Sequence, residues 1–390
     1  MRLNEELLKE VELFKAVKNG DIARVKELLK KDANVNARYK DGNTLLHLVL
    51  EGYMEEEHIV DIVKILLENG ADPNAKNVYG TTPLHQALLY DHFDAAEILI
   101  EKGAKVNIEN NYGYTPLHYA ASGGTLWIIS LLLEKGADPN ARSIGGVTPL
   151  HDAARSGNRE AIELLFNYGA DPNPRDKSGW TPLHYAACSR NSVVAHLLTG
   201  HEADVNAKEN THGWTPLHVA MLPVDPPRGN GGINFYTYIS NYRDDLAATS
   251  FAMVLISHGA DLNARDKDGN TPLHLAIAIG YFYVSWLLLN FGADPTIRNN
   301  EGKLPIECVH DSVRHYHDYW YYSEKMLEKI LNLLACASKE FLEDSKDFAV
   351  NNHADVSRAR ELDAVTTVCP YCGKPGLQAG DTWQVLLFSL

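Results

Sequence analysis

Long apolar runs are missing from this sequence of 390 residues, since no segment reaches the roughly 18 apolar residues that a membrane-spanning helix needs. Met1 to Lys18 alternates charged with apolar residues, so we expect no secretion by the general route. Cysteine is scarce as well. The five cysteines, an odd number, argue against a disulfide framework and favour a reducing compartment. These absences predict a soluble, cytoplasmic protein without a membrane partner, although they are compatible with delivery into another cell.

Basic residues and catalytic motifs are also under-represented. The chain has 36 lysine and arginine residues against 51 aspartate and glutamate residues, which gives a formal net charge of −15. A surface of this average charge repels a phosphate backbone, so a nucleic acid is a poor candidate partner. No glycine-rich phosphate loop, no serine nucleophile elbow and no His-Glu-x-x-His helix occurs in the sequence. We therefore expect neither nucleic-acid binding nor enzymatic activity.

What the sequence does have is one unit repeated at a nearly fixed interval. The tetrapeptide Thr-Pro-Leu-His, with a variant first copy and a degenerate last copy, recurs in steps of 33 or 34 residues, apart from two steps of 38 and 56. The copies begin at Thr44, Thr82, Thr115, Thr148, Thr181, Thr215, Thr271 and Leu304. A Gly-Ala-Asp tripeptide recurs in the same phase. A period of this length indicates a stacked array of small units rather than one globular core.

Residues 110–142 illustrate what one unit does. Thr115 followed by Pro116 is typical of a helix start, with a side-chain oxygen at the cap and a proline at the first helical position. The pattern predicts a short helix over 117–121 and, after a glycine pair, a second helix over about 126–135 with apolar residues at helical spacing. A glycine then stands where a left-handed C-terminal cap is needed.

This pattern closely resembles the ankyrin repeat. The Thr-Pro-Leu-His motif, the alanine pair after it, the paired leucines and the Gly-Ala-Asp ending stand at the offsets of that family over about residues 7–337. The resemblance implies an all-α repeat solenoid of helix-turn-helix units with β-hairpin fingers, in which finger tips and first helices line a concave groove. Counting both caps, we expect about nine units.

The ends and interruptions of the array divide the chain. We predict an array over 1–340, closed by an N-terminal cap at 5–37 and a C-terminal cap at 302–337. A tail over 341–390 follows. The longer steps correspond to five extra residues near Glu55 and to an insertion of 23 residues at about 223–245, which we place in loops on one face. The larger insertion is predicted to be a surface loop that the array does not need for folding, either functional or disordered.

Two recurrent polar groups are interpreted as structural. Seven of the 17 histidines lie in the repeated motif: His47, His85, His118, His151, His184, His218 and His274. In the family that the chain resembles, this imidazole hydrogen-bonds the turn around the motif threonine and the neighbouring repeat. The Asp and Asn of the Gly-Ala-Asp-x-Asn ending are expected to stabilise their loop through local hydrogen bonds and not to act as catalytic carboxylates.

Large aromatic residues stand at finger and inner-helix positions where the turn itself requires only polarity. Aromatic side chains bury a large area with few rotatable bonds and are enriched in recognition surfaces. The predicted partner-binding residues are Tyr79, Tyr90, Tyr112, Tyr114, Trp180 and Trp214, together with Phe235, Tyr236 and Tyr238 of the insertion. The alternative for the finger aromatics is packing on neighbouring fingers.

The tail contains Cys369-Pro-Tyr-Cys372-Gly, for which two kinds of site compete. The string matches a glutaredoxin active site, but the Gly-Lys-Pro-Gly that starts at Gly373 prevents the long helix that this fold needs. It also resembles one knuckle of a zinc ribbon. A closed structural zinc site needs four ligands and no second Cys-x-x-Cys follows, so Cys369 and Cys372 would need ligands from elsewhere or from another chain. An unligated thiol pair is the other possibility.

A second histidine group lies inside the predicted C-terminal cap. His310, His315 and His317 stand among several tyrosines and a tryptophan. They are either a metal site or part of an aromatic extension that shields the last repeat.

Together these features predict a non-enzymatic protein–protein interaction scaffold that binds a protein partner through the concave groove. We expect no cofactor other than zinc at the tail, and a monomer unless the Cys369/Cys372 tail pairs two chains. The alternatives are an adaptor whose C-terminal tail is a zinc-binding module, and the targeting arm of a larger enzymatic assembly.

Overall fold

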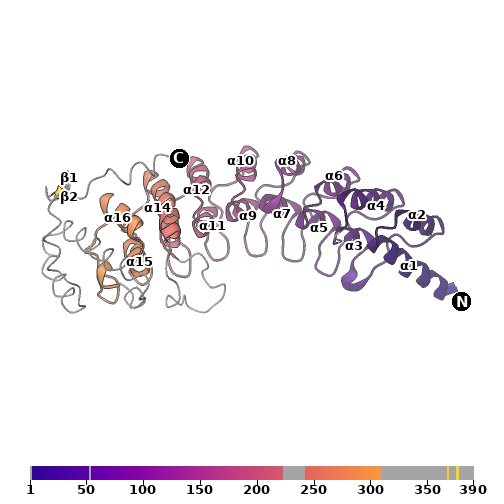
Figure 1. The fold of residues 1–390 in the computed structure, drawn as a ribbon, viewed down its shortest axis with the longest axis horizontal. Coiled ribbons are helices and arrows are strands. Elements are labelled where there is room, and N and C mark those ends of the chain that lie inside the picture. The colour runs from indigo at the N-terminus through magenta and orange to yellow at the C-terminus, as the bar shows by residue number, and fades with distance from the viewer. Residues whose placement is uncertain (1, 52–53, 223–241, 309–366, 369–374, 377–390) are drawn as a thin grey trace. The chain divides into compact units, whose positions relative to one another are not determined.

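The computed structural model describes residues 2–51, 54–222, 242–308, 367–368 and 375–376, and in this part of the chain a first helix alternates with a second helix from repeat to repeat (Figure 1). The first helices are α3 (Leu45–Leu50), α5 (Pro83–Leu89), α7 (Pro116–Gly123), α9 (Pro149–Ser156), α11 (Pro182–Ser189), α13 (Pro216–Ala220) and α15 (Pro272–Ile279). The second helices are α4 (Glu56–Glu68), α6 (Phe93–Glu101), α8 (Leu126–Glu134), α10 (Arg159–Asn167), α12 (Ser192–Gly200), α14 (Tyr242–Ser257) and α16 (Phe282–Asn290).

The remaining elements lie at the two ends of the chain and in one finger. Helices α1 (Arg2–Lys18) and α2 (Ile22–Lys30) form the predicted N-terminal pair, and a 3-10 turn, η1, lies in the first finger at Lys40–Gly42. A second 3-10 helix, η3 (Pro305–Cys308), belongs to the degenerate last copy of the motif, and the rest of the predicted C-terminal cap lies outside the described residues. Two short strands, β1 (Thr367–Val368) and β2 (Pro375–Gly376), pair antiparallel.

The array consists of two compact units. The first comprises Met1–Ser189 and Val193–Asp204, and the second comprises Arg190–Ser192 and Val205–Leu390. In the first unit the first helices form one layer, the second helices form another, and the fingers project beyond the first layer (Figure 1).

The motif threonine and histidine explain why each first helix begins where it does. In the repeat of α7 the backbone N–H of Thr115 donates to Nδ1 of His118 at 3.1 Å, and the threonine Oγ1 lies 2.9 Å from the same nitrogen. The same reciprocal contact occurs at every copy from Thr44 to Thr271. Helix α7 begins at Pro116, which has no N–H to leave unpaired at the first helical position. The predicted helix start is therefore confirmed.

Narrow hairpins, the fingers, connect consecutive repeats. In the finger before α7 the N–H of Asn110 donates to the carbonyl of Tyr114 at 2.9 Å. The tips of adjacent fingers are joined as well, because Ile144 N–H donates to the carbonyl of Tyr112 at 2.8 Å. Gly113 has φ of +76°, and a Cβ there would lie 2.6 Å from the Ile144 nitrogen. Glycine at this position therefore permits both the turn and the close approach of the next finger.

The core lies between the two helix layers of each repeat. Leu117, Ala120 and Ala121 of α7 face Ile128 and Leu132 of α8, and all five side chains are fully buried. Small alanines on the first helix allow the helix pair to approach closely, while the larger residues of the second helix fill the space between repeats. Within the described residues the fold is the predicted all-α repeat fold.

Both interruptions of the period differ from their predicted form. The second helix α4 spans 13 residues instead of the usual nine, so the extra residues near Glu55 lengthen the start of a helix instead of forming only a loop. The larger insertion, predicted over about 223–245, ends a few residues earlier. Helix α14 already begins at Tyr242, and Asp245 is a buried residue of the array that accepts N–H groups at the start of α16.

Candidate protein-binding surface

A row of exposed apolar side chains lies along the finger tips of the first unit. Val78, Tyr79, Tyr112 and Ile144 come from three consecutive fingers and are between 49% and 60% exposed. Backbone hydrogen bonds link the tips, from Asn111 N–H to the Tyr79 carbonyl and from Ile144 N–H to the Tyr112 carbonyl. These bonds fix the positions of the three tips relative to one another. We call these four residues the finger-tip row. Exposed apolar residues that are grouped in this way are typical of interaction surfaces.

Behind the tips, Tyr114 lies on the returning arm of its finger and packs against its own first helix. Its ring centroid lies 5.0 Å from that of His118 and 6.0 Å from that of Tyr119. The hydroxyl of Tyr119 in turn accepts a hydrogen bond from Nδ2 of Asn110 at 3.0 Å. Tyr114 is therefore half-buried, so it contributes both to repeat packing and to the surface between finger and helix.

Trp180 has a similar environment two repeats further along the chain. It is half-buried and contacts Tyr185 edge-on, with ring centroids 5.7 Å apart. Tyr185 donates its hydroxyl hydrogen to Oδ2 of Asp176 in the same finger at 2.9 Å. Burial, followed by the charge of Asp176, raises the pKa of Tyr185. The phenol therefore stays neutral and fixes the distance between finger and helix.

Between these two aromatic pairs lies Asp152, which sequence reasoning did not single out. It occupies on α9 the position that Tyr119 occupies on α7 and Tyr185 on α11. Its side chain is only 4% exposed, and its Oδ1 accepts a hydrogen bond from Nη2 of Arg155 at 2.8 Å. Burial raises the pKa of this carboxyl to about 7. We call Tyr114, Tyr119, Asp152, Trp180 and Tyr185 the inner-face cluster.

Trp214, which we predicted as a partner-binding residue, is buried instead. It is 7% exposed, its indole stacks on the ring of His212 at a centroid distance of 3.9 Å, and its Nε1–H donates to Oδ2 of Asp266 at 3.2 Å. The side chain is used for packing between two fingers of the second unit. Trp214 is therefore not an accessible contact residue.

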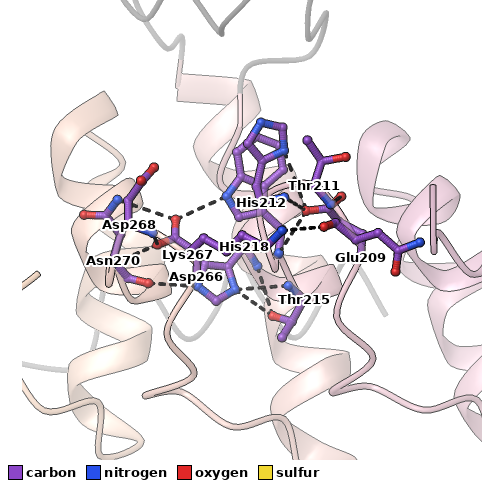
Figure 2. A network of polar contacts seen from close by, with 11 residues as sticks. Glu209, Thr211, His212, Thr215, His218, Asp266, Lys267, Asp268 and Asn270 are labelled. Carbon is purple, nitrogen blue, oxygen red and sulfur yellow. Dashed lines mark hydrogen bonds and ion pairs between the residues drawn. The ribbon is translucent and has the colours of Figure 1, made fainter. Parts of the chain in front are cut away.

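The cause lies in the finger that precedes Trp214, which is one residue longer than the others. Glu209 stands where most other fingers have Asp or Asn. It accepts backbone N–H groups from Thr211 and His212 (Figure 2), and also that of Trp214. Burial alone would raise the pKa of Glu209, but these three donors outweigh it and hold that pKa below its usual range. The longer acid spans the longer turn. The step of 34 residues before Thr215 was the only sequence signal of this arrangement.

The other predicted contact residues have different locations. Tyr90 is 47% exposed, but it follows the last residue of α5, at the opposite end of that helix from the finger, and so lies apart from the finger-tip row. Phe235, Tyr236 and Tyr238 lie outside the described residues, as do Cys369, Cys372 and the histidines of the predicted cap. In the part of the chain that the structure describes, no group of three or more His, Cys, Asp or Glu side chains could hold a metal ion.

The structural interpretation of the motif histidines is confirmed. Each ring uses Nδ1 for its own threonine, and in six copies Nε2 lies within 3.2 Å of a backbone carbonyl in the following repeat. Burial lowers the pKa of His85, His118, His151 and His218 to about 4. The imidazoles are therefore neutral at pH 7, with the proton on Nε2, and they are unsuited to acid–base catalysis.

The loop asparagines act over a longer range than we predicted. Asp138 does stabilise its own loop, because its Oδ1 accepts the N–H of Asn140 at 2.9 Å. Asn140, however, donates from Nδ2 to the carbonyl of Gly169 and accepts the N–H of Asp171, both in the next repeat, at 2.9 and 2.8 Å. Equivalent pairs recur through the first unit. The asparagine is thus a bridge between repeats, not a local group.

Among the described residues, no helix combines the length and the apolar character that crossing a bilayer requires.

Comparison with known proteins agrees with the repeat architecture. Family models described as ankyrin repeats match residues 13–110, 54–143, 107–176, 150–222, 212–267 and 255–308. A putative ankyrin repeat protein of Rickettsia felis is 46% identical over 59 residues, which cover 14% of this chain and 26% of that protein. Protein phosphatase 1 regulatory subunit 27 of Mus musculus is 45% identical over 56 residues, 14% of this chain and 36% of that protein. The 2-5A-dependent ribonuclease of Mus musculus is 43% identical over 72 residues, 18% of this chain and 9% of that protein. The chain therefore aligns with well under two thirds of the length of these relatives.

Proposed function

Because this chain belongs to the ankyrin-repeat family, whose repeats are protein–protein interaction modules, we propose that it is a non-catalytic scaffold that binds a protein partner through its first unit. The contact surface consists of the finger-tip row and the adjoining inner-face cluster. The similarity to a phosphatase regulatory subunit supports a role exerted on another protein, although the aligned segment is short.

The observation that carries this proposal is the finger-tip row. Val78, Tyr79, Tyr112 and Ile144 are about half exposed although polar residues would serve the same turns, as Lys177 and Ser178 do in the finger that follows. Leaving four apolar side chains partly in water is unfavourable. Fully burying one such side chain is worth about 1.5 to 3 kcal/mol relative to leaving it exposed. Burial against a partner would recover part of this free energy.

A triple variant, Tyr79→Ser with Tyr112→Ser and Ile144→Ser, tests the proposal by affinity capture and quantitative mass spectrometry. We expect the partner to be lost from the capture, because a recognition surface that loses its main apolar residues weakens by about 100-fold or more. The melting temperature should not fall, since none of the three side chains is buried.

Tyr168→Ser is the matched control. Tyr168 is 44% exposed but follows α10, on the layer of second helices, away from the fingers. Its substitution should leave capture unchanged. Equal recovery of the partner by the triple variant and by this control would show that the finger tips are not the contact surface.

A further inference from the structure

The loop that joins α6 to the finger before α7 differs from the loops of both neighbouring repeats. Residues 70–75 and 136–141 have the identical sequence Gly-Ala-Asp-Pro-Asn-Ala, whereas residues 103–108 have the sequence Gly-Ala-Lys-Val-Asn-Ile. An acid is thus replaced by a base, and a proline and an alanine are replaced by branched apolar residues. The same backbone hydrogen bond, from the alanine N–H to a carbonyl in the last turn of the second helix, forms in all three loops. The path of the loop therefore does not require the three replacements.

The loop keeps its bridge to the next repeat but lacks the local bond of its neighbours. Asn107 donates from Nδ2 to the Gly136 carbonyl at 2.7 Å and accepts the Asp138 N–H at 2.8 Å. Asp138, in its own loop, accepts the N–H of Asn140 at 2.9 Å. A lysine side chain has no acceptor, so Lys105 cannot make the corresponding bond. Lys105 therefore does not replace the aspartate in stabilising the turn.

The three replaced residues line one hollow of about 510 Å³ at the surface of the first unit. Apolar residues and two lysines make up most of its lining: Ile100, Ala104, Val106 and Ile108, with Lys105 and Lys135. The volume lies within the range of about 300 to 1,000 Å³ that is typical of binding pockets. No acidic residue is among the lining residues. The hollow thus combines apolar surface with positive charge in a chain whose net charge is −15.

The two lysines come from adjacent repeats, since Lys135 follows the last residue of α8. Both are exposed. Neither makes an ion pair within the described part of the chain, whereas Lys31, for example, contacts a glutamate at 2.6 Å. The hydrogen bond from Asn107 to Gly136 holds together the two loops that carry them. Two unpaired ammonium groups beside an apolar surface are complementary to an acidic and apolar ligand.

We propose that this hollow binds an acidic segment of a protein, in which one apolar side chain covers the hollow and neighbouring carboxylates pair with Lys105 and Lys135. A peptide fits better than a small organic acid, because Lys105, Asn107 and Lys135 are exposed and the hollow would cover a small molecule on one side only. A basic segment is disfavoured by the two ammonium groups. None of the lining residues belongs to the finger-tip row or to the inner-face cluster, so this second site goes beyond the proposed function.

The neighbouring loops provide a variant that removes the site and keeps the turn. Lys105→Asp with Val106→Pro and Ile108→Ala gives residues 103–108 the sequence of both flanking loops, and we call this protein the loop-restored variant. It should melt no earlier than wild type, because that sequence already forms the turn, with its local bond from aspartate to asparagine, on either side. Lys26→Glu is the matched control, since it makes the same change of charge at an exposed site on α2.

Random peptides displayed on phage are selected on the immobilised full chain and compared among the three proteins. Peptides that bind wild type and Lys26→Glu, but not the loop-restored variant, should contain Asp or Glu next to Leu, Ile, Val or Phe. If no peptide distinguishes the loop-restored variant from wild type, or if those that do lack acidic residues, the proposal is wrong.

One such peptide is then measured in solution by fluorescence anisotropy. Lys105→Ala and Lys135→Ala should each weaken its binding by about 3-fold, the size expected for an exposed ion pair. The triple finger-tip variant should change its binding by less than about 2-fold, because the two surfaces share no residue. A peptide that depends on the finger tips and not on the lysines would overturn this second site and support the proposed contact surface.

Hexanoate distinguishes a peptide site from a site for a small acid, because it carries one aliphatic chain and one carboxylate. At the concentration of the peptide, hexanoate should not displace it from wild type. Displacement would show that the hollow takes a small organic acid, contrary to the proposal.

Discussion

Trp214 donates its indole Nε1–H to Oδ2 of Asp266, 3.2 Å away, and so links the finger of one repeat to the finger of the next. The other oxygen of Asp266 accepts the N–H groups of Asp268 and Asn270, which close the second finger. One carboxylate therefore organises its own turn and holds the neighbouring one. The aromatic residue that sequence alone places on a recognition surface is a structural link within the second unit.

Substitution of Trp214 should accordingly reduce stability. Trp214→Phe keeps a ring but removes the hydrogen bond and should cost about 1 to 2 kcal/mol, whereas Trp214→Ala should cost about 3 to 5 kcal/mol. Urea unfolding followed by circular dichroism measures both. The half-buried Trp180→Ala should cost less than Trp214→Ala. A Trp214→Ala protein as stable as wild type would show that the contact with Asp266 contributes nothing.

Acid should weaken the array through the motif histidines. Burial lowers the pKa of His118 to about 4, below the value of about 6.5 for an unfolded histidine, so the unfolded chain binds more protons than the folded one between these values. Each such histidine makes its full contribution to the free energy of unfolding above about pH 6.5. On acidification this contribution falls by up to about 1.4 kcal/mol per pH unit. Asp152 and Asp245 act in the opposite direction, because their raised pKa values favour the folded state at low pH.

His118→Gln isolates the histidine effect from that of the carboxyls. Glutamine can accept from the Thr115 N–H and donate onward, as in an ordinary capping box, but it does not titrate. The free energy of unfolding of the variant, relative to wild type, should therefore increase between pH 6.5 and pH 5. A difference that does not change with pH would mean that the buried imidazole is not deprotonated by its surroundings.

The larger insertion should be removable if the array residues that pack beside it are kept. Arg190 donates from Nε to the carbonyl of Ala220 at 3.0 Å and from Nη2 to the hydroxyl of Tyr281 at 2.6 Å, while Asp245 accepts the N–H groups of Tyr283 and Val284. Deleting residues 224–241 and closing the chain with a Gly-Ser bridge should leave the melting transition nearly unchanged.

Asp245→Ala should, in contrast, lower stability by about 0.5 to 2 kcal/mol, as loss of a helix cap does. Thermal melting of the two proteins side by side is the appropriate measurement. If the deletion melts much earlier than the point variant, the deleted segment is part of the packing.

The asparagine bridge can be tested at Asn140. Asn140→Ala removes two hydrogen bonds to the next repeat and should cost about 1 to 3 kcal/mol. Asn167→Ala, at the exposed end of α10, is the matched control and should change stability by less than about 0.5 kcal/mol. Equal melting temperatures for the two variants would indicate that water replaces the bridge without loss.

Contacts that recur in every repeat were predictable from the sequence. Thr115 and His118 make the same contact with each other in every copy from Thr44 to Thr271, so spacing and the family resemblance together specify their roles. The exposure of Tyr79 and Tyr112 also follows from their place at the tip of a hairpin.

Contacts that depend on a difference between adjacent repeats were not predictable. Trp214 is buried because one extra residue and a glutamate reshape its finger. Oδ2 of Asp152 has no hydrogen-bond partner, which results from the combination of a short residue on the helix and a short residue on the finger. Each residue is ordinary by itself, and only the folded neighbourhood reveals the combination.

The histidine contacts give the array a direction. Because His118 donates forward to the carbonyl of Val147, and Asn107 donates forward to that of Gly136, each repeat relies on the one that follows it. Truncation after a repeat removes the acceptors of an imidazole N–H and of an amide N–H, whereas truncation before it removes the donors of two carbonyls. The two ends of a fragment therefore lose different groups, which makes the order of the repeats as consequential as their number.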